Sequence, residues 1–333
     1  MQTPDTQGPG GGALSSSCRW PRHLLPFLHG LIALTLYTAP VLSAPGPDVA
    51  PAPSRVVGGE FLYKVKRGDS LALIGARFGV GPQRLARANG LSPRSGLSVG
   101  QAIHVDNRHL APPVVREGIV INIPQRLLFF YRDGTLEGWY PVSLGRRDWQ
   151  TPTGLFTVSA RRRHPTWRVP PSIQEEMRRQ GQRVRTRVPP GADNPLGGYW
   201  IGLSGSLCGI HGTNAPSSIY GFRTHGCVRL HSDDAADLFS RVSVGTSVEV
   251  IYEPILLARE AGGAVFLEVN PDVYGRMDLR AGLEGAAARE NVLDSLDPAR
   301  VDAALAAQEG LATRVDRAQS GLWREESRPL TRR

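Results

Sequence analysis

The sequence predicts a mainly β protein, in which a β-rich domain follows a small strand–helix–helix–strand module. Glycine and proline are abundant, at 38 and 27 of 333 residues, and long stretches of helical periodicity are few. From residue 118 onward, short apolar runs recur, each bounded by glycine, proline or aspartate. With 41% hydrophobic residues, the chain is long enough to bury the core of one full-sized domain and of a smaller one.

The N-terminal segment has the layout of a secretory signal. Arginines precede an apolar stretch over residues 24–42, and small residues follow it. Pro26 and Pro40 make this stretch a poor permanent transmembrane helix. We therefore expect residues 1–44 to direct export, either as a cleaved signal peptide or as an N-terminal membrane anchor.

The charge and the cysteines bound the class of protein. The formal charge of +9 would attract a polyanion, and because export is expected we predict no nucleic-acid partner. Cys18 precedes the apolar stretch, which leaves Cys208 and Cys227 in an exported chain. Two cysteines do not make a disulfide scaffold, although they permit a single bridge.

Residues 45–60 are rich in proline and alanine and predict a linker. Residues 61–106 follow, with a strand at Tyr63–Val65, an N-cap at Ser70, two short amphipathic helices and a final strand. This segment resembles the LysM module in Y-x-V-x-x-G-D-S-L-x-x-I-x-x-x-F, L-x-x-x-N-G-L and L-x-x-G-Q-x-I. The resemblance implies a βααβ fold that binds peptidoglycan glycan strands. The alternative is a small packing domain without a ligand.

Residues 117–253 predict the β-rich domain, with a hairpin turn at Asp133-Gly134 and one helix after the main motif, capped by Ser232. An arginine-rich insertion over residues 161–190 contains a short helical piece and predicts either a lid or substrate wall, or a solvated loop. Residues 254–333 form a C-terminal extension, in which 264–276 predicts one strand and the rest is partly helical or disordered.

The stretch HGTNAPSSIYGFRTHGCVRL, residues 211–230, concentrates reactive side chains. Cys208, His211, His225 and Cys227 are zinc-ligand types, but the one-residue spacing in H-G-C is not the usual one. A Cys208–Cys227 disulfide is a second possibility. The third is thiol catalysis, in which a histidine takes the proton of Cys227 and leaves a thiolate beside an imidazolium.

Catalysis also needs orienting groups. The Gly212 carbonyl could fix the tautomer of His211, and Gly226 lets the main chain approach Cys227 closely. Arg229, two residues beyond Cys227, would lie on the same strand face and could bind a substrate carboxylate.

The same stretch resembles the signature of the L,D-transpeptidase (YkuD) family, H-G-T followed by [ST]-H-G-C-V-R. Here these are His211-Gly212-Thr213 and Thr224-His225-Gly226-Cys227-Val228-Arg229. Residues 151–158, 164–173 and 188–203 also resemble the periplasmic ErfK/YbiS/YcfS/YnhG-like group, whose members carry an N-terminal LysM module. The resemblance implies a YkuD-type β-sandwich or barrel-like catalytic domain.

The resemblance also implies a mechanism, with no metal or organic cofactor. Cys227 attacks the meso-diaminopimelate carbonyl of a tetrapeptide stem, D-alanine leaves, and His211 acts as general base. The N–H groups of Gly226 and Cys227 form much of the oxyanion hole, and His225 shapes the site or is a second candidate base.

Arg229, Thr224 and Thr213 are the substrate-binding candidates. The acceptor is diaminopimelate in a 3–3 cross-link, a lysine of an outer-membrane lipoprotein, or water in an L,D-carboxypeptidase. The non-enzyme alternative is a peptidoglycan-binding protein whose cysteine is held by zinc or a disulfide.

Cys208 is not part of the family motif. Three residues before His211, it would point to the opposite face of a regular strand, which predicts buried packing. A redox switch with Cys227 is the alternative.

Overall fold

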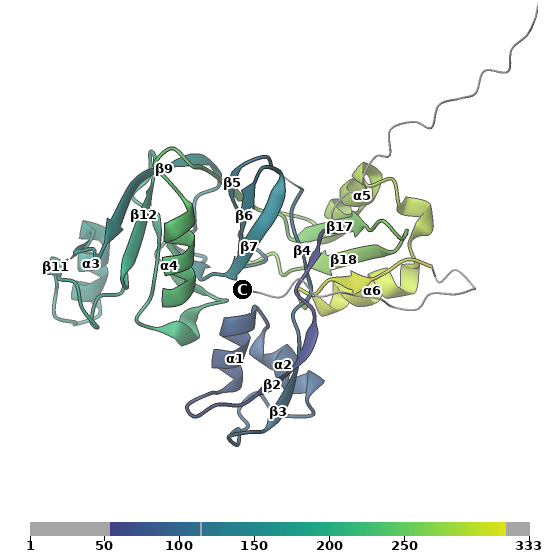
Figure 1. The fold of residues 1–333 in the computed structure, drawn as a ribbon, viewed down its shortest axis with the longest axis horizontal. Helices are drawn as coiled ribbons and strands as arrows, with labels where there is room; N and C mark the ends of the chain where they lie inside the picture. Colours follow the sequence, from purple (N-terminus) through teal and green to yellow (C-terminus); the bar gives the residue numbers. More distant parts are fainter. Residues whose placement is uncertain (1–53, 114, 318–333) are drawn as a thin grey trace, which may run out of the picture. The chain divides into compact units, whose positions relative to one another are not determined.

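The structure, a computed structural model, describes residues 54–113 and 115–317 (Figure 1). The predicted signal segment, residues 1–44, and Cys18 lie outside the described residues. No helix in the described ranges is both long and apolar enough to span a membrane.

The N-terminal module has the predicted order of strand, helix, helix, strand. Strands β2 (Glu60–Lys64) and β3 (Ala102–Asp106) pair antiparallel, and helices α1 (Leu71–Phe78) and α2 (Pro82–Ala88) lie between them in the chain. The Ser70 hydroxyl accepts a hydrogen bond of 3.2 Å from the Leu73 N–H, so the predicted N-cap is confirmed.

A short ladder follows the module. Strand β4 (His109–Leu110) pairs antiparallel with β1 (Val56–Val57), which lies in the segment predicted as a linker. Val56 and Val57 are an apolar pair, and Val57 is buried. The proline-rich residues before them made the whole segment look like a linker in the sequence. The linker therefore ends in a strand.

The main domain is a curled sheet, so the mainly β expectation is confirmed. The β13–β15 and β5–β16 pairs are parallel, and the other neighbours are antiparallel. In sheet order the strands are β15 (Val228–Arg229), β13 (Gly209–His211), β12 (Tyr199–Leu203), β9 (Gly154–Arg163), β16 (Ser247–Ile251), β5 (Gly118–Asn122), β6 (Leu127–Arg132) and β7 (Thr135–Pro141).

The two edges of this sheet meet, which gives it a barrel-like closure. Ser143, just after β7, forms a β-bridge with Arg229 of β15, and the two residues exchange both backbone hydrogen bonds at 2.8 Å. Next to this bridge, β8 (Leu144–Gly145) pairs parallel with β14 (Phe222–Thr224). The closure places Arg229 beside the loop that carries the H-G-C motif.

Local turn chemistry explains the β6–β7 hairpin. Asp133 and Gly134 have φ values of +49° and +74°, and Arg132 pairs directly with Thr135. Positive φ at both central residues suits a tight hairpin and favours glycine, so the predicted turn is confirmed.

The predicted cap of the helix after the motif is wrong. Helix α4 spans Ser232–Arg241 and its N-cap residue is His231, which makes no side-chain capping bond. The Ser232 hydroxyl instead donates to the Thr213 carbonyl at 3.1 Å. The hydroxyl that the local pattern assigned to capping therefore bonds to a carbonyl 19 positions away in the chain.

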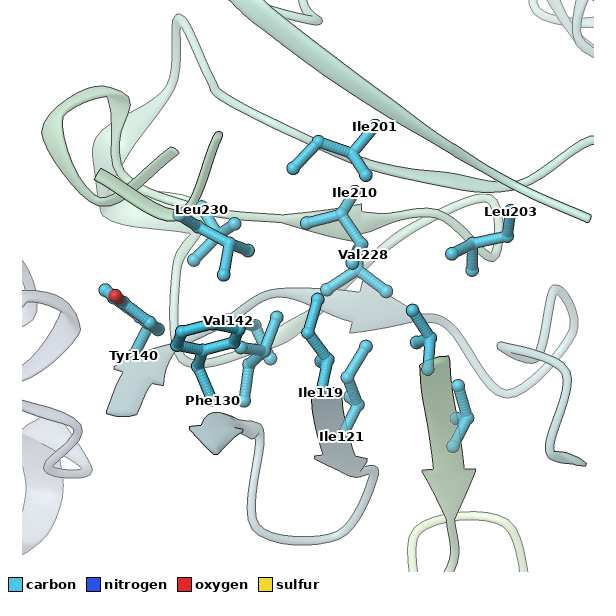
Figure 2. Close-up of a cluster of buried hydrophobic side chains, with 14 of the residues drawn as sticks. Ile119, Ile121, Phe130, Tyr140, Val142, Ile201, Leu203, Ile210, Val228 and Leu230 are labelled. Carbon is cyan, nitrogen blue, oxygen red and sulfur yellow. The ribbon is translucent and has the colours of Figure 1, made fainter. Parts of the chain in front are cut away.

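The core of the main domain lies inside the curled sheet (Figure 2). Ile210 of β13 and Val228 of β15 are fully buried there, among side chains such as Ile119, Phe130 and Ile201. Because side chains alternate along a strand, His211 and Arg229 lie on the opposite face from these two.

The arginine-rich insertion forms a lobe between β9 and β12. It contains β10 (Trp167–Arg168), α3 (Pro171–Arg179) and β11 (Arg187–Val188), and β10 pairs with β11. We call residues 164–198 the arginine lobe. Strand β9 extends to Arg163, further than its apolar pattern suggests, because it pairs with Tyr199 of β12.

The C-terminal segment has its own core. The sequence predicted one strand there, but β17 (Ile255–Arg259), β18 (Val265–Val269) and β19 (Thr313–Arg314) form a three-stranded sheet. Strand β19 has only two exposed residues, so its sequence carries no strand signal. The remaining elements are η1 (Pro216–Ser218), α5 (Leu279–Arg289), η2 (Leu293–Ser295) and α6 (Pro298–Ala307).

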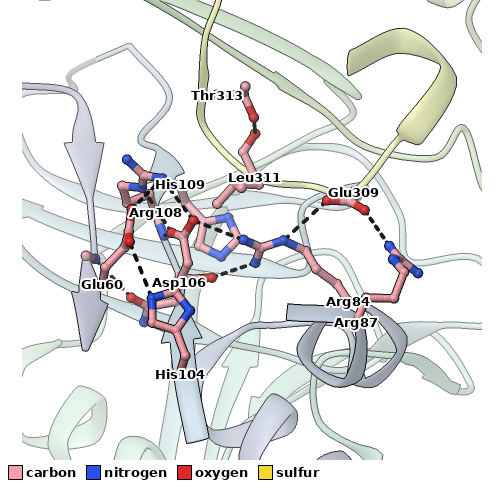
Figure 3. A network of polar contacts seen from close by, with 12 residues as sticks. Glu60, Arg84, Arg87, His104, Asp106, Arg108, His109, Glu309, Leu311 and Thr313 are labelled. Carbon is pink, nitrogen blue, oxygen red and sulfur yellow. Dashed lines mark hydrogen bonds and ion pairs between the residues drawn. The ribbon is translucent and has the colours of Figure 1, made fainter. Parts of the chain in front are cut away.

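A polar network connects the LysM-like module to residues near the C-terminus (Figure 3). Arg84 contacts Asp106 at 3.1 Å and Glu309 at 3.4 Å, while Arg108 contacts Glu60 at 2.8 Å. Nearby, His109 Nδ1 lies 3.1 Å from Glu268 Oε1, with both side chains buried. Burial opposes ionisation of Glu268, but His109 and hydrogen bonds from the Leu110 N–H and Gln125 lower the pKa of this carboxyl.

Candidate active site

The β13–β15 register brings the motif residues together. His211 pairs with Arg229 and Ile210 with Val228, in parallel. Cys227 directly precedes this ladder, and its side chain lines the same cavity as those of His211 and Arg229. The alternation that buries Ile210 and Val228 therefore presents His211, Arg229 and Cys227 on the cavity side.

His211 is held on two sides. Its Nδ1 lies 2.7 Å from the Gly212 carbonyl oxygen, the acceptor that the sequence suggested. Because a carbonyl only accepts, Nδ1 carries the proton and Nε2 keeps its lone pair. The ring also stacks on Trp200, with centroids 6.0 Å apart and planes at 21°.

Burial controls the charge of His211. The side chain is 4% exposed, and desolvation, assisted by the charge of Arg229, lowers its pKa from 6.5 to about 3. The imidazole is therefore neutral at physiological pH and can accept a proton at Nε2.

Cys208 contradicts its prediction of packing away from the site. It lines the cavity, and its thiol is in hydrogen-bonding contact with that of Cys227. Residues 204–207 form a turn, so the strand alternation counted back from His211 does not extend to Cys208. Both cysteines are free thiols.

The contact splits the two thiol pKa values. Hydrogen bonding to Cys227 lowers the pKa of Cys208 to about 7. The same contact, together with burial, raises the pKa of Cys227 well above its ordinary value of 9.0. Hydrogen bonding by the Gly209 backbone works in the opposite direction and lowers the pKa of Cys227.

These directions favour a neutral Cys227 thiol beside a neutral His211, rather than the preformed thiolate–imidazolium pair expected from the sequence. Within the described part of the chain, no hydrogen bond joins Cys227 to the His211 ring. Proton transfer between them would then accompany attack on a substrate instead of preceding it.

Thr224 fixes the loop that carries the cysteine. Its hydroxyl donates to the Cys227 carbonyl at 2.6 Å and accepts from the Gly226 N–H at 3.2 Å. This changes one prediction, because the Gly226 N–H is already committed within the loop and is not free for an oxyanion. The N–H of Gly209 was not foreseen as a donor.

Gly226 is required by the backbone and by space. Its φ is +102°, and a Cβ there would lie 3.2 Å from Cys208 Sγ and 3.3 Å from the Gln150 carbonyl oxygen. A larger residue would strain the turn and displace the Cys208 thiol.

His225 is tied to the arginine lobe. Its Nε2 bonds to Glu176 of α3, and its ring packs edge-on against Trp149 with centroids 4.7 Å apart. Glu176 also accepts from Arg146 at 2.9 Å. Burial disfavours the ionised form of Glu176, but hydrogen bonds and charge from His225 and Arg146 outweigh it and lower the pKa of this carboxyl. The sequence motif gave no indication of Glu176, Arg146 or Trp200.

Two substrate-binding candidates differ in their placement. Arg229 lines the cavity, donates to the Ser218 hydroxyl at 2.8 Å, and has a buried Nε with no partner among the described residues. Thr213 is buried, accepts from the Ala215 N–H at 2.9 Å and does not line the cavity, so it does not face a substrate.

The cavity at Cys227 is large, about 1700 Å³. Its walls come from the ends of β9, β12, β13 and β15 and from the arginine lobe, so the insertion forms a wall of the site. In the described ranges, no three His, Cys, Asp or Glu side chains converge as a zinc site needs.

Comparison with known proteins identifies the two domains. Residues 116–250 match the family model of the L,D-transpeptidase catalytic domain (YkuD), and residues 63–106 match the LysM domain. The chain is 37% identical to the probable L,D-transpeptidase YcfS of Escherichia coli over 68% of this chain and 73% of that protein.

A second relative matches along the whole of its own length. The probable L,D-transpeptidase ErfK/SrfK of Salmonella typhimurium is 31% identical over 90% of this chain and 100% of that protein. Among solved structures, L,D-transpeptidase 3 from Mycobacterium tuberculosis is 17% identical, and the match covers 61% of this chain and 98% of that one with a TM-score of 0.33. The sequence matches confirm the resemblance noted from the motifs, and the chain belongs to the L,D-transpeptidase family.

Proposed function

We propose that the protein is a periplasmic, cysteine-dependent peptidoglycan L,D-transpeptidase. The observation that carries the proposal is the placement of Cys227, His211 and Arg229 on one wall of a single cavity, within a catalytic domain of this family. The LysM domain supports binding to peptidoglycan glycan strands. The apolar segment at residues 24–42 supports export.

The acylation step uses a neutral pair. His211 Nε2 takes the Cys227 proton as Sγ attacks the meso-diaminopimelate carbonyl of a tetrapeptide stem. The tetrahedral intermediate then expels D-alanine, whose amine receives the proton from His211, and a thioester remains on Cys227.

Backbone donors stabilise the oxyanion of this intermediate. Because the Gly226 N–H is bonded to Thr224, we assign the oxyanion to the N–H groups of Cys227 and Gly209. The Thr224 clamp keeps the Cys227 peptide in place during this step.

The second step transfers the acyl group. An amine attacks the thioester, His211 takes the amine proton, and Cys227 leaves and regains its proton. With diaminopimelate as acceptor the product is a 3–3 cross-link, with a lipoprotein lysine it is a protein–peptidoglycan conjugate, and with water it is a tripeptide.

The test is a turnover assay with the full chain and a purified disaccharide-tetrapeptide, analysed by liquid chromatography and mass spectrometry. We expect release of D-alanine and formation of cross-linked dimers, and neither product from Cys227→Ala. A lysine peptide added as competing acceptor distinguishes lipoprotein attachment from cross-linking. Glycan binding without release of D-alanine would leave a peptidoglycan-binding protein and overturn the proposal.

A further inference from the structure

A band of arginines lines the cavity around Cys227. Two lie at the end of β9 and four in the arginine lobe, and all six line the same cavity. We call this set the arginine wall; its members are Arg162, Arg163, Arg168, Arg183, Arg185 and Arg187.

These guanidinium groups are not neutralised by the protein. None of the six forms an ion pair with a residue in the described ranges, and Arg163 only approaches the face of the Phe239 ring at 5.6 Å. The cavity has two acidic residues, Glu176 and Asp193, and Glu176 is already shared by Arg146 and His225. The cavity is therefore strongly electropositive.

Elsewhere in the arginine lobe, an arginine does form an ion pair with a neighbouring carboxylate. On the outer side of α3, Arg178 pairs with Glu175 at 2.6 Å, one helical turn away. The mutual repulsion of six unpaired cations around one cavity is energetically unfavourable. A ligand with several negative charges would remove it.

We propose that the arginine wall selects stem peptides whose carboxylates are free, and discriminates against stems in which a carboxylate is replaced by a carboxamide. This inference rests on the proposed function. A tetrapeptide stem offers carboxylates on its glutamate, diaminopimelate and terminal alanine residues, and a guanidinium matches the planar carboxylate in shape and charge.

The position and the size of the cavity favour stem peptides over a separate anionic polymer. The arginine wall shares its cavity with the nucleophile, so the charges that it binds belong to the molecule that reacts. A volume of about 1700 Å³ exceeds that of a typical small-ligand pocket, which leaves room for a donor and an acceptor stem together.

The solvent exposure of the six arginines limits how strongly they can select between stems. The arginine side chains of the wall are open to solvent, so each contact contributes modestly and is screened by salt. We expect the loss of one carboxylate to lower kcat/KM about three- to fivefold at low ionic strength. At about 0.5 M salt, where the screening length is a few ångströms, the difference disappears.

The experiment measures kcat/KM for acylation of the full chain by matched stems, one with all carboxylates free and others with a single carboxamide. A triple variant, Arg183→Gln/Arg185→Gln/Arg187→Gln, should lose most of the discrimination and most of the salt dependence. The control triple, Arg116→Gln/Arg179→Gln/Arg289→Gln, removes the same charge from exposed positions outside the cavity and outside the LysM domain, and should behave as the wild type. Thermal unfolding of both triples checks that each is folded.

The outcomes separate the two proposals. If no stem acylates the protein, the proposed function fails. If free and carboxamide stems acylate equally in low salt, the function stands and the selection is overturned. Polyphosphate added as a competitor gives a further readout: inhibition that the arginine triple abolishes, without discrimination between the stems, would assign the wall to a phosphate polymer and count against the inference.

Discussion

The Cys208 thiol lies in hydrogen-bonding contact with the Cys227 thiol, in the cavity that His211 also lines. The contact lowers the pKa of Cys208 to about 7 and raises that of Cys227. Cys208, which is not part of the family motif, therefore controls the protonation of Cys227, the central residue of that motif.

Replacing Cys208 tests this control. Cys208→Ala removes the largest cause of the raised pKa of Cys227, so the pH at which Cys227 becomes reactive should fall. Alkylation by iodoacetamide at a series of pH values, followed by peptide mapping of Cys227, measures the inflection. Cys208→Ser keeps a hydrogen-bonding group and should shift the inflection less. An unchanged inflection in Cys208→Ala would show that the contact does not set the pKa.

The same contact predicts sensitivity to oxidation. With a small disulfide as oxidant, exchange at one thiol and attack by the other should close a Cys208–Cys227 bridge, releasing two small thiols. Intact mass should fall by two hydrogens, transpeptidation should stop, and a reductant should restore both. Cys208→Ala should instead retain a mixed disulfide. Full activity of the wild type under oxidising conditions would exclude the bridge.

Acid sensitivity follows from His211. The native imidazole stays neutral down to about pH 3, whereas a histidine of the unfolded chain titrates near 6.5. The unfolded state therefore binds more protons between these values, and the free energy of unfolding falls as the pH drops below 6.5. Between pH 6.5 and 5 this one group contributes a loss of about 2 kcal/mol.

The matched variant is His211→Gln. Urea denaturation at pH 7 and pH 5 should show a smaller acid loss in the variant than in the wild type, by about that amount. Equal losses would mean that His211 is not held neutral by burial.

Removing the buried carboxylate of Glu268, in the C-terminal segment, should lower the free energy of unfolding. Its buried carboxylate contacts His109 at 3.1 Å and accepts from Leu110 and Gln125. Glu268→Ala leaves these donors unsatisfied and should cost about 3–5 kcal/mol. Glu290→Ala, which removes a partly exposed ion pair with Arg55, should cost about 1 kcal/mol or less. Similar urea midpoints for the two variants would contradict this account.

Local patterns predicted much of the fold. The Ser70 cap and the Asp133-Gly134 turn depend on neighbours within a few residues, so the sequence was enough to place them. The residue spacing also placed Cys227 and Arg229 in one cavity, because strand alternation holds up to Arg229.

Tertiary partners account for the errors. The position of Cys208 depends on a turn at residues 204–207, and the use of the Gly226 N–H depends on the rotamer of Thr224. Glu176 reaches His225 across 49 positions of the chain, a contact that spacing within the motif cannot indicate. Ser232 likewise donates to a distant carbonyl instead of capping its own helix.

The measurement that tests the central claim most directly is the intact mass of the full chain, quenched in acid shortly after mixing with a disaccharide-tetrapeptide. We predict a transient adduct equal to the substrate minus D-alanine, present in the wild type and in Cys208→Ala and absent in Cys227→Ala. An adduct that persists in Cys227→Ala, or none in the wild type while D-alanine is released, would contradict a thioester on Cys227.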